Sequence, residues 1–271
     1  MNPTEEILAR LEQIEREEGV CIIYACESGS RAWGFESQDS DFDVRFLYVQ
    51  PTERYLSVMS KPDVIERPAD EVFDTSGWDL RKALQLLHRS NPPLLEWLQS
   101  PIVYRERSEI VSRIRSLMPQ YYQPVACHYH YLHMAQGNNR EYLQGDTVWL
   151  KKYLYVLRPV LACLWIERGY GPVPMEFAAL IEQLVDQGDV KAAILDLVGR
   201  KKAGDELARG PRIPVISDFL EAELTRLSTK EAPPATRTSG ADLDRVFRQC
   251  LIDIYGAHID ADSPTSNGRQ S

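Results

Sequence analysis

The chain has 271 residues, of which 44% are hydrophobic and 26% charged, a balance typical of a globular protein with a sizeable core. A formal net charge of −9 argues against nucleic-acid binding over the whole surface but leaves room for a local basic groove. No apolar run approaches the ~20 residues of a membrane span, and the five cysteines match no metal-binding spacing. We therefore expect a cytoplasmic protein with buried free thiols and no membrane partner.

The first fifty residues predict a helix followed by two strands. Residues 4–18 carry apolar side chains at helical spacing, with Thr4 as the expected N-cap and Gly19 as the stop. Residues 20–26 form a short apolar run, which predicts a strand buried on both faces. Residues 41–49 are rich in β-favouring side chains and predict a second strand.

A glycine and a serine, Gly29 and Ser30, follow the first of these strands. Glycine at the end of a strand allows a tight turn and a close approach to a ligand. Residues 30–35 are expected to begin a short helix whose free N–H groups would bind an anion such as a triphosphate, with the Ser30 hydroxyl as a further donor. The alternative is a solvated turn, because glycine and serine are common in turns.

Two aspartates, Asp41 and Asp43, open the second strand. Side chains at i and i+2 of a strand point to the same face, ~6–7 Å apart along the chain, so these carboxylates should project together. Paired carboxylates suit hard cations such as Mg²⁺, and two-metal phosphoryl-transfer sites hold their ions about 3.5–4 Å apart. Each motif alone is common by chance, but both in this order, each attached to a strand, indicate a phosphoryl-transfer site.

These motifs resemble the signature of the DNA polymerase β nucleotidyltransferase superfamily. The longer string CESGSRAWGFESQDSDFDVRFLYVQP, residues 26–51, is similar to the YcgL/RlaP type of nucleotidyltransferase. The resemblance continues through residues 76–84, 91–98 and 151–159 and covers roughly residues 1–258. It implies an α/β (α+β) fold, with a small mixed sheet in a polymerase-β-like core followed by a helical lobe.

The resemblance also implies an enzymatic reaction and residue roles. An acceptor hydroxyl would attack the α-phosphate of a nucleoside triphosphate, with ATP the expected nucleotide, and pyrophosphate would leave. Asp41 and Asp43 would bind Mg²⁺ or Mn²⁺, and Gly29 and Ser30 would hold the β- and γ-phosphates. Arg31 would either assist them or form an outward salt bridge.

Sites of this superfamily use a third carboxylate from a neighbouring strand. Residues 63–66 and 71–74 are expected to form two short strands. Asp74 follows a Val-Phe pair and precedes a Thr-Ser-Gly turn, which suits a strand end beside Asp41 and Asp43. Asp79 is the competitor, but acidic residues at a helix start simply favour the helix dipole. We therefore predict Asp74 as the third catalytic and metal-binding acid.

The second half of the chain predicts helices. The expected boundary of the nucleotidyltransferase core is Met118-Pro119, which assigns residues 1–118 to the core, residues 119–258 to the helical lobe and residues 259–271 to a disordered tail. The histidines at positions 128, 130 and 133 lack metal-site spacing, so we expect them to pack or to line the cleft. Residues 200–202, Arg-Lys-Lys, are expected to be solvated.

The strongest helical pattern spans residues 147–168. Lys151, Tyr155 and Arg158 fall at i, i+4 and i+7, on one face of that helix. A cationic face turned to the cleft would neutralise the nucleotide phosphates, so Lys151 and Arg158 are predicted nucleotide-binding residues. A solvated charged face is the alternative.

The acceptor is the open question at this level. An RNA end, as in RNA repair, is one acceptor; a protein hydroxyl, modified by adenylylation as in minimal nucleotidyltransferase antitoxins, is another; a small molecule is a third. A nucleotide-binding protein that has lost catalysis is the rival from another class.

Overall fold

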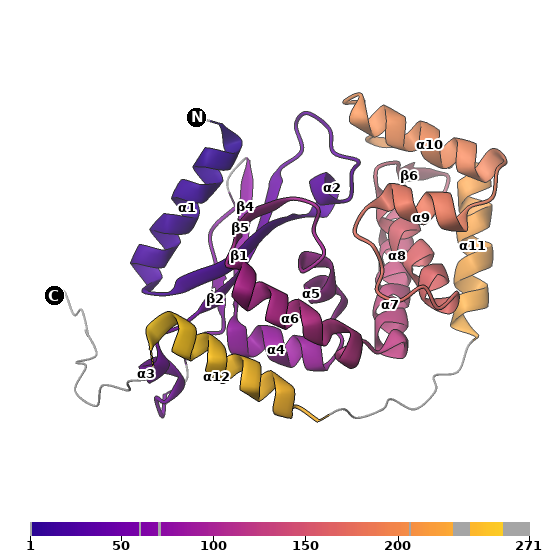
Figure 1. The fold of residues 1–271 in the computed structure, drawn as a ribbon. Coiled ribbons are helices and arrows are strands. Elements are labelled where there is room, and N and C mark those ends of the chain that lie inside the picture. The colour runs from indigo at the N-terminus through magenta and orange to yellow at the C-terminus, as the bar shows by residue number, and fades with distance from the viewer. Residues whose placement is uncertain (1, 60, 70–71, 206, 230–238, 257–271) are drawn as a thin grey trace.

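The computed structural model describes residues 2–59, 61–69, 72–205, 207–229 and 239–256. Its centre is a five-stranded sheet in the order β3-β4-β2-β1-β5 (Figure 1). The strands are β1 (Cys21–Ser28), β2 (Phe42–Val49), β3 (Val64–Glu66), β4 (Phe73–Asp79) and β5 (Val103–Glu106). Strands β2 and β4 are parallel and the other pairs are antiparallel, which confirms the small mixed sheet.

Helices cover both faces of this sheet. Helix α1 (Pro3–Glu18) packs on one face, where Ile7 and Leu11 meet Ile22 of β1 and Phe46 of β2. The opposite face is covered by α4 (Leu80–His88), α5 (Pro92–Trp97) and α6 (Ser108–Tyr121). Burial of both faces explains why the β1 sequence is continuously apolar instead of alternating.

The ends of α1 show how local chemistry sets an element. Gly19 adopts a left-handed conformation with φ 60°, and the helix stops there as predicted. The N-cap, however, is Asn2 and not Thr4: its side chain accepts a hydrogen bond from the Thr4 N–H, and Glu5 completes a capping box. The Thr4 prediction was wrong because the N-cap lies two residues earlier, at Asn2, and Pro3 is the first residue of the helix.

The remaining elements are mainly helical. They are the short α2 (Gly29–Ala32) and α3 (Thr52–Tyr55), and then α7 (Pro124–Tyr142), α8 (Lys152–Glu167), α9 (Phe177–Leu184), α10 (Asp189–Lys202), α11 (Pro214–Ser228) and α12 (Ala241–Tyr255). A two-stranded sheet, β6 (Thr147–Trp149) with β7 (Arg209–Pro211), lies among them. Residues 147–149, expected to be helical, therefore form a strand.

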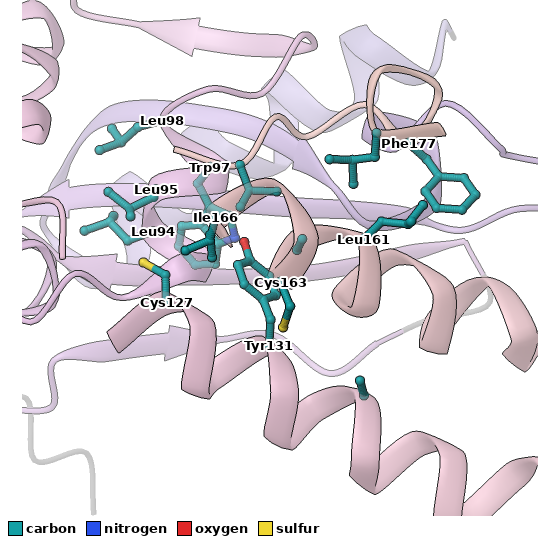
Figure 2. Close-up of a cluster of buried hydrophobic side chains, with 14 of the residues drawn as sticks. Leu94, Leu95, Trp97, Leu98, Cys127, Tyr131, Leu161, Cys163, Ile166 and Phe177 are labelled. Atoms are coloured by element: carbon teal, nitrogen blue, oxygen red, sulfur yellow. The ribbon is translucent and has the colours of Figure 1, made fainter. Parts of the chain in front are cut away.

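One hydrophobic cluster continues from the sheet into the helical half. Figure 2 shows Leu94 and Trp97 of α5 packed near Tyr131 of α7 and Leu161 of α8. Helix α6 runs through the expected boundary at residues 118 and 119. Helix α12 lies against α4 and α6 (Figure 1). The two halves therefore share a core.

The expected tail, residues 259–271, lies outside the described residues. All five cysteines are free and buried. Within the described part of the chain, every helix is too short or too polar to traverse a bilayer.

Candidate active site

The Gly29-Ser30 motif directly meets Asp43 of β2, whereas Asp41 lies just before the first residue of that strand. Gly29 has φ 68°, a conformation that favours glycine. A Cβ atom placed on Gly29 would lie 2.1 Å from Oδ2 of Asp43, so the Asp43 carboxylate occupies the space that any other residue would fill. Ser28, at the end of β1, is the register partner of Asp43 in β2. The antiparallel pairing of β1 with β2 thus brings the two motifs together.

A cleft of about 470 Å³ opens beside these residues. Of the residues predicted from the sequence, Ser30, Asp41, Asp43 and Lys151 line it, together with Tyr155. The sheet side and the helical side each contribute one wall. The remaining lining residues are Ser37, Asp39, Ser40, Trp149, Lys201, Gly204, Asp205, Leu207 and Ala208.

Asp43 is held in a network of charges at the edge of this cleft. Burial raises the pKa of Asp43, and the nearby Arg45 guanidinium opposes that shift. Arg45 Nη2 lies 3.3 Å from Asp43 Oδ1 and 2.7 Å from Asp74 Oδ2. Arg45 therefore joins the Asp43 and Asp74 carboxylates and reduces the repulsion between them.

Of the two candidates for the third acid, Asp74 is the one beside Asp43. The two aspartates are register partners in the parallel pair β2–β4, which directs their side chains to the same face. Strand β4 continues past Asp74 to Asp79, so the expected Thr-Ser-Gly turn is in fact strand. Asp74 does not line the cleft itself, and Arg45 holds it at the cleft edge.

Asp79 has a structural position. It is 2% exposed and caps α4, accepting hydrogen bonds from the Arg81 N–H at 2.8 Å and from the Tyr55 hydroxyl at 2.6 Å. Its side chain also accepts from Gln50 at 3.2 Å. All of these partners lie away from the cleft, so Asp79 fits a capping role.

The carboxylates of Asp41 and Asp43 would suit a hard cation whose remaining ligands come from another molecule. Among the described residues, no group of three or more His, Cys, Asp or Glu side chains is assembled closely enough to hold a metal ion alone. Mg²⁺ commonly binds through one or two carboxylates, with phosphate oxygens and waters supplying the remaining ligands. Asp41 and Asp43 on the cleft wall match that donor set.

Arg31 does not face the cleft. Its guanidinium donates to the carbonyls of Ser40 at 2.5 Å and Asp41 at 3.1 Å and lies over the Phe42 ring. Among the residues that the structure describes, Arg31 forms no salt bridge, and it is not a cleft-lining residue. These contacts hold the segment that precedes β2 and so position Asp41.

Arg158 was predicted to face the cleft, and this prediction was wrong. Its side chain is 3% exposed, pairs with Glu96 at 2.8 Å and donates to the Met175 carbonyl at 3.2 Å. Tyr131 donates to the same Glu96 oxygen at 2.5 Å. Nearly the whole of α8 is buried in this half of the molecule, so the helical face that holds Arg158 meets α5 and not solvent.

Sequence reasoning missed Lys201. It lies in the Arg-Lys-Lys triplet that was expected to be solvated, but it lines the cleft and its ammonium group sits 5.6 Å from the centre of the Phe35 ring. Burial lowers the pKa of Lys201, and the charge of Lys151 lowers it further. Neither lysine has a carboxylate partner among the described residues, so both are available to an anionic ligand.

The three histidines of α7 lie outside the cleft. The rings of His128 and His133 flank Tyr129, and the ring of His130 lies near Tyr131. Burial lowers the pKa of His130. None of the three is a cleft-lining residue, and the ring contacts just described are with tyrosines of α7 itself.

A buried acid, Glu27, was also missed. It is 0% exposed, accepts a hydrogen bond from the Asp43 N–H at 2.8 Å and accepts another from the Tyr104 hydroxyl. Burial raises the pKa of Glu27 from 4.5 to about 7. The strand was expected to end at residue 26, so Glu27 was placed in the following loop and not recognised as part of a buried strand.

Glu27 makes stability depend on pH in a defined direction. An acid whose pKa is raised on folding binds more protons in the folded state, so unfolding free energy falls as pH rises from 4.5 through about 7. We expect this group to cost roughly 2–3 kcal/mol between about pH 5 and pH 8, and Glu27→Gln to remove that slope. Urea unfolding of the wild type and of Glu27→Gln across this pH range measures the free energy of unfolding of each protein. Parallel profiles for the two would contradict the expectation.

Comparison with known proteins places the chain in a family. A protein from Bacillus subtilis (strain 168), "Uncharacterized protein YcgL", is 46% identical over 253 residues, which covers 93% of this chain and 97% of that protein. A crystal structure of a nucleotidyltransferase-like protein from Exiguobacterium sibiricum 255-15 covers 89% of this chain and 88% of its own, at 12% identity and a TM-score of 0.29, too weak a likeness to support a conclusion. The profile of the family "RlaP: RNA repair pathway DNA polymerase beta family" matches residues 4–249, and the chain therefore belongs to that family.

Proposed function

We propose that the protein is a metal-dependent nucleotidyltransferase that moves a nucleoside monophosphate from an NTP, with ATP the expected donor, to an RNA end. One observation carries the proposal: the Asp43 carboxylate is packed against the Cα of Gly29, at a cleft lined by Asp41, Ser30 and two lysines that have no carboxylate partner in the described part of the chain. Acidic and cationic groups face the same space, as a metal–triphosphate complex requires. The RNA acceptor is proposed from the RNA repair description of the family.

The residues would divide the work by their charge. Asp41 and Asp43 would hold Mg²⁺ or Mn²⁺, which when bound neutralises phosphate charge and favours attack at the α-phosphate. The Ser30 hydroxyl, beside Gly29, would donate to the β- or γ-phosphate. Lys151 would neutralise the pyrophosphate that leaves. Asp74 is the proposed third acid, which would orient the attacking hydroxyl once Arg45 releases it.

Nucleotide binding is expected to require the cation. Four aspartates, Asp39, Asp41, Asp43 and Asp205, line the cleft against two lysines, so a bare triphosphate meets net repulsion there. We expect NTP affinity to fall at least about tenfold when Mg²⁺ is replaced by EDTA. Calorimetric titration with ATP, CTP, GTP and UTP, with and without Mg²⁺ or Mn²⁺, measures this effect. Equal affinity in both conditions would exclude a metal–nucleotide site.

The acceptor is tested by label transfer. Each NTP, labelled at the α-phosphate, is incubated with the protein, Mg²⁺ and one acceptor at a time: single-stranded RNA, RNA with a blocked end, or cell protein. Label on the open RNA end alone supports the proposal. Label on protein would indicate an adenylyltransferase, and Mg²⁺-dependent NTP binding without transfer to any acceptor would indicate a nucleotide-binding protein.

A further inference from the structure

An exposed tryptophan stands at the rim of the cleft on the helical side. Trp149 ends β6, lines the cleft and is 38% exposed. Ligand-binding clefts commonly combine aromatic side chains with a few polar groups. Neither the metal site nor the lysines account for a flat apolar group at this position.

The small sheet holds Trp149 in a defined place. Val148 is buried and Leu150 is packed on the core, so alternation along the strand turns Trp149 to the opposite side. The Leu150 N–H donates to the Ala208 carbonyl at 3.0 Å, which extends the pairing of β6 with β7. A Cβ atom on Gly210 would lie 2.8 Å from Leu150, so this contact depends on glycine. The position of Trp149 is thus fixed by the pairing of β6 with β7.

The surroundings of Trp149 are cationic. Arg209 is its register partner in β7, with the guanidinium carbon 5.5 Å from the centre of the ring. Lys151, two residues along, and Lys201 line the same cleft without carboxylate partners among the described residues. An aromatic platform beside unpaired cations is the combination that binds nucleobases and their phosphates.

We propose that Trp149 stacks on a nucleobase, with Arg209 beside its ring and Lys151 near the attached phosphates. This deepens the proposed function and rests on it, because the base would belong either to the bound NTP or to the end of the acceptor RNA. A flat, negatively charged ligand suits this rim, whereas the four cleft aspartates disfavour ligands that bring no cation. The stacking contact itself needs no transfer reaction and can be measured alone.

The test compares ligands that differ only in carrying a base. Binding of ATP with Mg²⁺, tripolyphosphate with Mg²⁺ and a short single-stranded RNA is measured for the wild type, Trp149→Ala and Trp149→Phe. Loss of stacking is expected to weaken ATP or RNA about 5- to 150-fold, with Trp149→Phe close to the wild type and tripolyphosphate unchanged. The ligand that weakens identifies whether donor or acceptor base is stacked. Tyr170→Ala, an exposed aromatic outside the cleft, is the matched control.

Two results would overturn the proposal. One is unchanged binding of both ATP and RNA in Trp149→Ala; the other is equal weakening of tripolyphosphate, which would mean that the cleft was disturbed. If Trp149→Ala does not fold, tryptophan fluorescence decides. The emission of the wild type minus that of Trp149→Phe gives the contribution of Trp149, and saturating ligand should quench this contribution. A contribution that ligand leaves unchanged refutes stacking. Absence of nucleotidyl transfer, by contrast, would refute only the proposed function.

Discussion

Replacing Asp43 with Asn is expected to lower nucleotidyl transfer by on the order of 10²–10³-fold or more, the scale seen when a group that stabilises transition-state charge is removed. The side chain keeps its shape, so it still fits against Gly29, but it loses the charge that would bind the cation. Because burial raises the pKa of Asp43, its ionised form destabilises the fold above that pKa. The variant should therefore melt at the same temperature as the wild type in EDTA, or higher.

Label transfer with Mg²⁺ and thermal melting in EDTA are the two measurements. Asp39→Asn removes the same charge from the same cleft at a residue with no assigned role, and it should retain most of the activity. Asp74→Asn should behave like Asp43→Asn if it is the third acid. Asp79→Asn should chiefly lower stability, since Asp79 caps α4 and accepts from Tyr55. A folded Asp43→Asn protein with full transfer would refute the proposed site.

Replacing Arg158 with Ala is expected to destabilise the protein by about 3–5 kcal/mol. Glu96 is buried, and without Arg158 its charge would keep only the Tyr131 hydroxyl as the partner of Oε1. A loss of this size corresponds to a fall in Tm of roughly 10 °C in a chain of this length. The pair joins α5 of the sheet half to α8 of the helical half, and Glu96 also bonds to Tyr131, which is labelled in Figure 2. Thermal and urea unfolding give the values.

The double variant Glu96→Gln, Arg158→Met separates charge from packing. Removing both charges should recover much of the lost stability, because no unpaired buried charge remains. Lys151→Ala is the matched control: this exposed lysine should leave the Tm almost unchanged while weakening NTP binding. An Arg158→Ala protein that melts like the wild type but binds NTP poorly would restore the original interpretation of Arg158 as a cleft residue.

The contrast between Lys151 and Arg158 shows where helical spacing stops being informative. Both were placed on one face by the i, i+7 pattern, and Lys151, the N-cap of α8, does line the cleft together with Tyr155. Arg158 is covered instead by Glu96, the Met175 carbonyl and the Trp33 ring, which the spacing along the helix cannot reveal. The prediction for Lys201 failed in the opposite direction. Its charged sequence neighbours indicated a solvated side chain, but in the structure its ammonium group lies over the Phe35 ring. A charge pattern cannot distinguish a cleft wall from an open surface, since both are polar.

The mixed α/β character and the local motifs could be predicted from the sequence because they depend on residues close together in the chain, and the family could be predicted from the longer resemblance. An apolar run buried on two faces, a glycine that ends a helix and two aspartates at i and i+2 are each encoded within a few residues. The set of distant side chains that share the cleft became visible only in the folded structure. Asp74 lies beside Asp43 because β2 and β4 pair in parallel. Trp149 lies at the rim because β6 pairs with β7, 60 residues further along the chain. Arg158 is buried because it pairs with Glu96 of α5. These contacts join segments far apart in the chain, and their formation depends on the packing of the whole core.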